Sequence, residues 1–290
     1  MKNTTSRLLG CMIGATVLTT PLVAQAATWS DTFIGYRYGA DFTEPVNDNK
    51  VAKHIVQFTH ASGYSIGQNF LNLDILQSDS EDKASNSDSG ATEFYLTYRH
   101  QLHLGKIFDT SMAFGPVKEV AITGGFDLST KNTAFAPRKR LMVLGPTLKF
   151  DVPGFLDVSL LAAKEWNHCG LGAPACPKSD IAFDPYLVFN VAWGIPFQLA
   201  SVPLKFQGFL NYNTEKGKDY AGVKTKAETL MRTSLMVDVG QMVGGRKNTV
   251  LMGVGYEYWR NKFGNHAFAN GTTKAGIDTD APTFQMEVHF

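Results

Sequence analysis

The chain contains many segments of roughly ten residues in which apolar and polar side chains alternate. Such alternation places the apolar side chains on one face of a β-strand and the polar side chains on the other. The last segment, FQMEVHF (284–290), is an example, with its aromatic and aliphatic residues at even positions. A soluble β-sandwich and a transmembrane β-barrel both contain strands of this kind, so the alternation by itself predicts an all-β fold.

Alternation predicts twelve strands, each long enough to cross a bilayer. They are expected at 29–39, 51–61, 67–76, 92–102, 116–128, 139–150, 155–165, 181–192, 203–213, 227–239, 248–259 and 282–290. An even number of antiparallel strands returns both termini to the same side of a membrane. The last strand is expected to pair with the first, so that no strand edge faces lipid.

The segments between these strands alternate in length. Connectors after even-numbered strands are mostly short and several contain Gly or Pro, whereas those after odd-numbered strands are mostly longer and polar. The connector 77–91 is acidic, rich in Ser and almost devoid of apolar residues. Short turns at one rim and long loops at the other are typical of bacterial outer-membrane barrels, whose short turns are periplasmic and long loops extracellular.

The distribution of aromatic residues separates the two all-β architectures. A broad apolar face with aromatic side chains near the strand ends indicates an interfacial girdle rather than the core of a sandwich. The expected girdle residues are Tyr36, Tyr38, Phe150, Tyr212, Tyr256, Tyr258 and Phe290. An eight-stranded lipocalin-like barrel would leave a third of the segments unused. We therefore expect a transmembrane antiparallel β-barrel of about twelve strands in the outer membrane of a Gram-negative bacterium.

The N-terminal 26 residues have the pattern of a cleaved signal peptide. Lys2 and Arg7 precede an apolar stretch that ends in Ala24-Gln25-Ala26. The alternative is a lipoprotein signal at Cys11, but the apolar region before this cysteine is too short. Residues 27–290 are then expected to form a single barrel domain, and this part contains no stretch of about 18 apolar residues.

Net charge argues against nucleic acid as a partner. The chain has 27 Lys and Arg against 26 Asp and Glu, so removal of Lys2 and Arg7 leaves 25 against 26. The expected partners are instead the lipid and lipopolysaccharide of the outer membrane, its assembly machinery and a small solute.

Cys169 and Cys176 lie in the segment CGLGAPAC, in a chain that is expected to be exported. An oxidising compartment and this short spacing favour a local disulfide. A zinc site is the alternative, but beyond His168 the sequence offers no further ligand nearby. We expect no metal and no cofactor.

Several short motifs resemble one known family. FGPVKE (114–119), GFLNY (208–212), GVKTK (222–226), YW (258–259) and the terminal Phe290 are similar to segments of the Tsx-type nucleoside-specific channels and the related OmpK-type outer-membrane proteins. The resemblance implies a monomeric twelve-stranded barrel, passive uptake of nucleosides, and recognition of the C-terminal Phe by the assembly machinery. Some relatives are also phage or colicin receptors. The cysteine loop and the acidic segment 77–91 depart from the family pattern.

Residues on the polar strand faces are expected to line the lumen, where a diffusing solute needs weak, successive sites. Aromatic side chains there can stack on a nucleobase, and polar groups can bind ribose hydroxyls. Each is also explained by a structural role, as packing within the lumen or as part of a self-neutralising charge network. The candidates are Phe33, Arg37, Phe70, Asp74, Tyr95, Arg99, Glu119, Tyr186, Phe209, Asn211, Glu228, Arg232 and Trp259.

The sequence lacks the motif HExxH, and His100 and His103, three residues apart, would face opposite sides of a strand. We therefore expect no enzymatic activity, although a Ser–His pair assembled across strands is the alternative. The first functional hypothesis is a channel for passive diffusion of nucleosides or similar polar and aromatic solutes. The second is a barrel that acts mainly as a surface-binding, adhesion or phage-receptor protein through its long loops.

Overall fold

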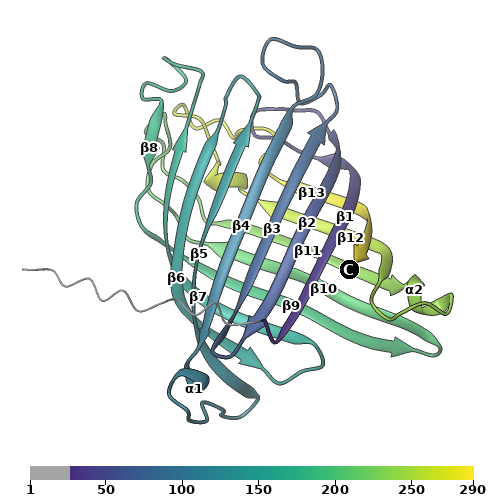
Figure 1. Ribbon diagram of the computed structural model, residues 1–290. Coiled ribbons are helices and arrows are strands. Elements are labelled where there is room, and N and C mark those ends of the chain that lie inside the picture. The colour runs from purple at the N-terminus through teal and green to yellow at the C-terminus, as the bar shows by residue number, and fades with distance from the viewer. Residues whose placement is uncertain (1–26) are drawn as a thin grey trace, which may run out of the picture.

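The structure is a computed structural model that describes residues 27–290, which form a closed antiparallel β-barrel (Figure 1). The expected signal peptide, residues 1–26, lies outside the described residues. The long strands of the described chain are β1 (Trp29–Phe42), β2 (Val51–Tyr64), β3 (Gly67–Ser78), β4 (Thr92–His103), β5 (Val117–Lys131), β6 (Arg138–Phe150), β7 (Phe155–His168), β9 (Tyr186–Leu199), β10 (Val202–Asn213), β11 (Glu228–Asp238), β12 (Val250–Arg260) and β13 (Thr279–His289).

Each long strand pairs antiparallel with its neighbours in sequence, and β1 pairs with β13. In this closing ladder Phe33 lies opposite His289 and Tyr38 lies opposite Phe284. The twelve-stranded closed barrel and the pairing of its first and last strands are confirmed. Closure gives every long strand two partners, which is what a sheet needs in a medium without water.

Exposure along the strands is the reverse of that in a soluble protein. On β6, the outward Met142 and Leu144 are both 61% exposed, whereas inward charges such as Asp74 and Glu287 are 2% and 1% exposed. Exposed apolar side chains outside and buried charges inside are what a barrel surrounded by lipid requires. The described part of the chain is a transmembrane barrel of the outer-membrane type.

One strand was misplaced by the sequence pattern. The segment 181–192 was expected to be a single strand, but the structure divides it between β8 (Asp180–Ala182), a short extension of the sheet beside β7, and β9. Pro185 lies in the break, and proline has no N–H to donate to a sheet. The expected connector 193–202 was also wrong, because β9 continues to Leu199 and a two-residue turn leads into β10.

The two rims differ as expected, with two exceptions on the side of the short turns. There, residues 104–116 contain helix α1 (Leu104–Ile107) and residues 239–249 contain helix α2 (Val239–Met242). The opposite rim carries β8 and the 3-10 turn η1 (Lys262–Gly264), and Figure 1 shows these at the other end of the barrel from α1. None of the described helices is long and apolar enough to span a membrane.

Aromatic residues project outward toward the ends of the strands. The hydroxyl of Tyr256 donates to the carboxylate of Asp280, and the guanidinium of Arg260 lies over the ring of Tyr258 at 3.9 Å. The hydroxyl of Tyr36 is hydrogen-bonded to the Nδ1 atom of His54 at 2.6 Å. Aromatic rings with polar tips suit the interface between lipid and water, so these contacts agree with the expected girdle.

Candidate functional site

The candidate site is the interior of the barrel, where one ion pair crosses from wall to wall. Arg232 on β11 donates from Nη1 to Oδ2 of Asp74 on β3 at 3.1 Å. In the sheet order, β12, β13, β1 and β2 lie between these two strands. Side chains on strands so far apart meet only through the lumen, so this contact divides the interior near its middle.

Further polar groups complete what we call the central lumen cluster: Arg37, Gln57, Asp74, Arg232 and Glu257, together with the ring of Phe209. The Nε atom of Arg232 donates to Glu257 at 2.6 Å, and Nη2 of Arg37 donates to Asp74 at 3.3 Å. Two guanidinium groups thus face two carboxylates. Because both acids are nearly fully buried, this pairing offsets a desolvation cost that unpaired charges would carry.

Two buried polar atoms of this cluster have no hydrogen-bond partner in the described chain. They are Nε of Arg37, which is a donor, and Oε1 of Gln57, which is an acceptor. Buried polar atoms are normally satisfied by protein groups or by water. A donor and an acceptor lying in the same cluster suit a hydroxyl group, which both donates and accepts.

Phe209 supplies an aromatic surface beside these charges. The guanidinium carbon of Arg232 lies 5.9 Å from the centre of the Phe209 ring, and Phe209 pairs with Arg232 in the β10–β11 register. The preceding Gly208 makes the close pairing feasible, because a Cβ atom there would lie 2.2 Å from the carbonyl oxygen of Arg232. The glycine of the GFLNY motif therefore has a local structural role next to the cluster.

A second network lines the wall formed by β4, β5 and β6. Arg99 donates to Asp127 at 2.6 Å, and the hydroxyl of Tyr95 donates to the same carboxylate at 2.9 Å. Lys139 in turn donates to the hydroxyl of Tyr95 at 3.1 Å. Tyr95 also packs against an apolar cluster inside the barrel that contains Ile55 and Leu76. The interior of this barrel therefore contains buried aliphatic residues as well as the expected aromatic ones.

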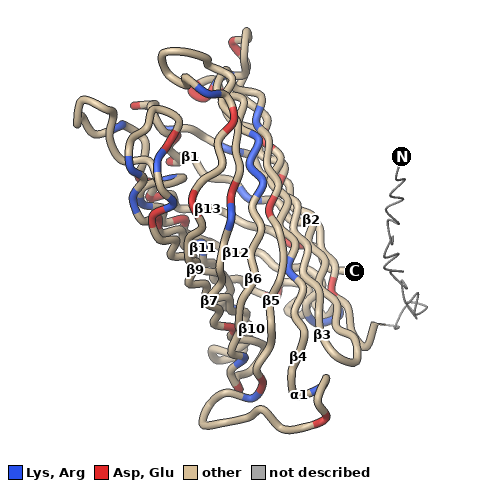
Figure 2. Tube along the Cα trace, turned by 90° about the vertical axis from the view of Figure 1, so that its left-hand side faces the viewer, with Lys and Arg blue, Asp and Glu red and all other residues tan. Residues whose placement is uncertain are grey.

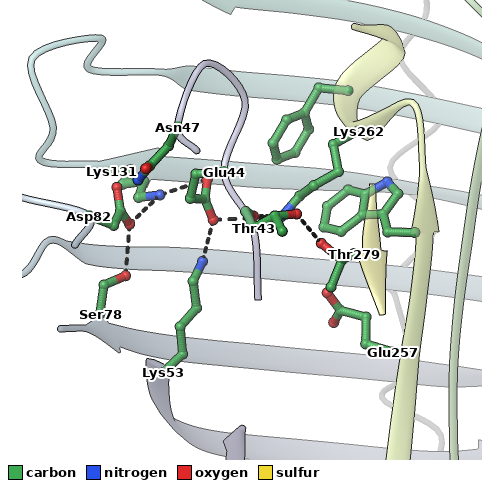
Figure 3. Close-up of polar contacts among 12 residues, drawn as sticks. Thr43, Glu44, Asn47, Lys53, Ser78, Asp82, Lys131, Glu257, Lys262 and Thr279 are labelled. Atoms are coloured by element: carbon green, nitrogen blue, oxygen red, sulfur yellow. Dashed lines mark hydrogen bonds and ion pairs between the residues drawn. The ribbon is translucent and has the colours of Figure 1, made fainter. Parts of the chain in front are cut away.

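Closer to the long loops, a cluster of three lysines surrounds Glu44 in the β1–β2 loop (Figure 3). Lys53 donates to Oε1 of Glu44 at 2.5 Å, Lys131 lies 3.0 Å from Oε2, and Lys262 lies 3.6 Å from Oε1. Burial opposes ionisation of Glu44, but the three ammonium groups outweigh burial and hold its pKa well below the ordinary value. Asp82 also accepts from Lys131, so loops 43–50 and 79–91 are tied together.

Lys262 is almost completely buried and connects the same loop to η1. Its ammonium group donates to the backbone carbonyl of Thr43 at 2.5 Å and lies 4.4 Å from the centre of the Trp259 ring. Burial lowers the pKa of Lys262 and the attraction of Glu44 raises it, but burial is the larger effect. The pKa of Lys262 is therefore below its ordinary value. The hydroxyl groups of Thr43 and Thr279 are hydrogen-bonded beside it at 2.6 Å.

Other expected site residues belong to separate groups. Tyr186 donates to Glu165, which accepts two hydrogen bonds from Lys216, and Trp259 donates to Glu228 at 2.7 Å. Asn211 accepts from Asn190 at 2.7 Å. These contacts join neighbouring strands or fasten a loop to the wall, so a structural role accounts for each of them.

The remaining three expected residues lie toward the short-turn end or apart from any cluster. Glu119 accepts from the backbone N–H of Gly105 at 3.0 Å and so holds α1 to β5. The ring of Phe33 lies 4.8 Å from that of His289. Phe70 remains 38% exposed.

The structure therefore brings together Arg37, Asp74, Phe209 and Arg232 from the expected set, and pairs Tyr95 with Arg99 elsewhere. Sequence reasoning missed several residues of the lumen networks. Gln57 and Asp127 could have been identified, because they lie at the alternate strand positions that face inward. Glu44 and Lys262 lie in loops, where strand periodicity carries no signal. Both sulfur atoms of Cys169 and Cys176 form the expected disulfide, so neither is available as a zinc ligand.

Charged residues gather toward the long-loop end of the barrel (Figure 2). Further contacts cross the lumen nearer the other end: Gln101 on β4 donates to Asp157 on β7 at 3.1 Å, and Gln207 on β10 donates to Glu287 on β13 at 2.6 Å. The lumen thus contains polar contacts at several heights, and in the central cluster a contact between distant strands lies beside an aromatic ring.

No protein-family model and no curated protein matches the sequence. Among solved structures, the translocator domain of the autotransporter NalP from Neisseria meningitidis aligns with a TM-score of 0.43 and 13% identity over 90% of this chain and 88% of that chain. The β domain of the Bordetella autotransporter BrkA aligns with a TM-score of 0.38 and 8% identity over 91% and 100%. Pseudomonas aeruginosa OccK11 aligns with a TM-score of 0.31 and 11% identity over 90% and 96%. Likenesses this distant assign neither a family nor a solute.

Proposed function

We propose that this protein is an outer-membrane channel for passive diffusion of nucleosides or similar small solutes that combine a flat aromatic group with hydroxyl groups. Transport of this kind requires neither a catalytic residue nor a cofactor, and the proposal assigns the protein no enzymatic activity. The short motifs similar to Tsx-type channels support it, as does the composition of the central lumen cluster. The proposed working unit is a monomer.

One observation carries the proposal: Arg232 bridges the lumen to Asp74 beside the face of Phe209. The side chain of Arg232 is 24% exposed, so water can compete for its contact with Asp74. A solute that displaces this guanidinium meets the Phe209 ring for stacking and the unpartnered polar atoms of Arg37 and Gln57 for its hydroxyl groups. Each contact is weak, as conduction requires.

The test is block of single-channel current by adenosine in planar bilayers, with Phe209→Ala compared against Phe206→Ala. Phe206 is the matched control because it lies on the same strand but faces outward and is 41% exposed. Stacking on an aromatic ring contributes about 1–3 kcal/mol, so the Phe209 variant should require at least about fivefold more adenosine for half block. Equal block of the wild type and the Phe209 variant would remove Phe209 from the site.

A second candidate function is surface binding through the long loops, including a role as a phage receptor. The favouring observation is that these loops are joined to one another. Lys131 at the end of β5 contacts Glu44 and Asp82, and Glu44 also contacts Lys262, so three loops are connected; a disulfide closes the segment 169–176. A fixed loop surface suits recognition of a partner, because little ordering entropy is lost on binding. A correctly folded barrel that produces no current steps would favour this function over the first.

A further inference from the structure

The outer wall of the barrel carries an isolated group of basic side chains. Arg138 and Arg140 lie two residues apart on β6, next to its long-loop end, and both are exposed. Their outward direction follows from the alternation on β6, where Leu141 and Val143 are buried and Met142 and Leu144 are exposed. An outward charge costs about 2–4 kcal/mol at the bilayer midplane but only about 0–1 kcal/mol near the interface, so the place of these residues next to the long-loop end suits contact with lipid headgroups.

Neither guanidinium has an ion-pair partner within residues 27–290. By contrast, the outward Arg260 on β12 is paired with Asp280 on β13 at 2.9 Å. Asp180 on β8 interacts electrostatically with both β6 arginines, but its carboxylate is already hydrogen-bonded to His168. One shared carboxylate cannot neutralise two guanidinium groups, so the outer surface here keeps net positive charge.

The arginines border a groove in the outer wall. Its volume is about 320 Å³, and its lining includes Phe94 and Leu96 on β4, Leu128 on β5, and both arginines on β6. On the other side of β6, Arg140 is paired in register with the exposed Trp166 of β7. The floor and flanks of the groove are therefore apolar, and its charged edge lies toward the long-loop end.

The ligand that fits is amphipathic and anionic. Apolar side chains suit an acyl chain, whereas arginine binds phosphate through two parallel N–H···O contacts. Residues two apart on a strand are separated by about 7 Å, so the two guanidinium groups can bind either one phosphate or two phosphates on adjacent sugars. The ligand must also enter from the membrane, because the groove is in the lipid-facing wall.

We propose that this groove, with Arg138 and Arg140 at its edge, binds a phosphorylated glycolipid of the outer leaflet. The phosphate groups contact the two guanidinium groups, and an acyl chain lies over Phe94, Leu96 and Leu128. The lipid supplies the counter-charge that the protein lacks on this face. This site is independent of the lumen and of whichever solute passes through it.

The experiment measures binding of bisphosphorylated lipid A to the purified full-length barrel in detergent by native mass spectrometry. Each arginine near a lipid headgroup lowers the dissociation constant by a factor of about five. The double variant Arg138→Gln/Arg140→Gln should therefore bind lipid A about thirtyfold more weakly. Lys118→Gln is the matched control, because Lys118 is an exposed basic residue near the opposite end of the neighbouring strand β5. It should change the dissociation constant by less than about twofold.

Two further ligands test the source of the phosphate and do not depend on any variant. Wild-type protein should bind dephosphorylated lipid A as weakly as the double variant binds the phosphorylated form, and inorganic phosphate should not compete. Equal binding of the two lipids, unchanged binding by the double variant, or an equal loss in Lys118→Gln would each overturn the proposal. Competition by inorganic phosphate at the same concentration as lipid would instead indicate a site for a free anion and would overturn it too.

Discussion

The contact between Arg232 and Asp74 gives the most specific prediction of the account. Arg232→Gln and Asp74→Asn, made singly and together, form a double-mutant cycle across the lumen. The two side chains come from strands that are not neighbours, so their coupling reports contact through the interior rather than pairing within the sheet.

The magnitude follows from burial and from the partners that remain. Arg232→Gln leaves Glu257, which is 3% exposed, without its guanidinium partner, and breaking such a buried pair costs about 3–5 kcal/mol. Partial exposure of Arg232 places the expected cost near 3 kcal/mol. Asp74→Asn leaves Arg37 and Arg232 facing one another without the shared acid. The coupling energy between Arg232 and Asp74 should therefore be on the order of 2 kcal/mol.

The assay is reversible unfolding of the barrel in lipid vesicles with urea, followed by tryptophan fluorescence and by gel mobility of unheated samples. Arg260→Gln and Asp280→Asn form the matched control cycle, because this pair is outward and both side chains are more exposed. An exposed pair should couple by only about 0.2–1 kcal/mol. A lumen coupling no larger than that of the control would refute the inward, cross-barrel placement of Arg232.

The remaining predictions concern the loops and the wall. Glu44→Gln should destabilise the long-loop end by about 3 kcal/mol at pH 7, measured as faster hydrogen exchange in residues 43–50. Because the folded pKa of Glu44 is lowered, its stabilisation is present above about pH 4.3 and is lost as the pH falls through the folded pKa; wild-type protection in residues 43–50, taken relative to the intrinsic exchange rate at each pH, that does not fall in acid would contradict this. Gly208→Ala should lower the urea midpoint, since its Cβ would meet the carbonyl of Arg232, and an unchanged midpoint would oppose the close pairing. Leu144→Arg should cost about 2–4 kcal/mol in lipid vesicles although Leu144 is 61% exposed, and a negligible cost would place this residue outside the hydrocarbon. Cys169→Ser should make the segment 169–176 more sensitive to protease while the barrel stays folded, and unaltered cleavage would indicate that other contacts hold this loop.

The strands were predictable because lipid imposes a period of two on every membrane-crossing segment. β3 and β10 were placed within two residues of their observed ends by this pattern alone. The same period fails where the chain leaves the bilayer. Apolar and polar residues alternate through β8 and the first residues of β9, and only Pro185 marks the break between the two strands. The inward direction of Arg37, Asp74 and Arg232 also followed from parity.

Which inward residues meet across the lumen was not predictable, since contacts between β3 and β11 depend on strand stagger and on the cross-section of the barrel. Strand alternation predicts that Phe33 and Phe209 both face inward. Phe33 packs on His289, whereas Phe209 lies beside Arg232. Loop residues such as Glu44 and Lys262 carry no periodic signal at all. Their partnership joins positions separated by more than 200 residues and is set by how the loops fold over the rim.

The central claim is that solutes cross this barrel at the point where Arg232 meets Asp74. Single-channel recording of the wild type and of Arg232→Gln in planar bilayers tests it most directly. We expect discrete current steps for the wild type that adenosine reduces. For the variant we expect larger, more cation-selective steps, because its lumen has lost one positive charge and one bridging side chain. Absence of steps in both proteins, with the barrels folded by gel mobility, would contradict the account.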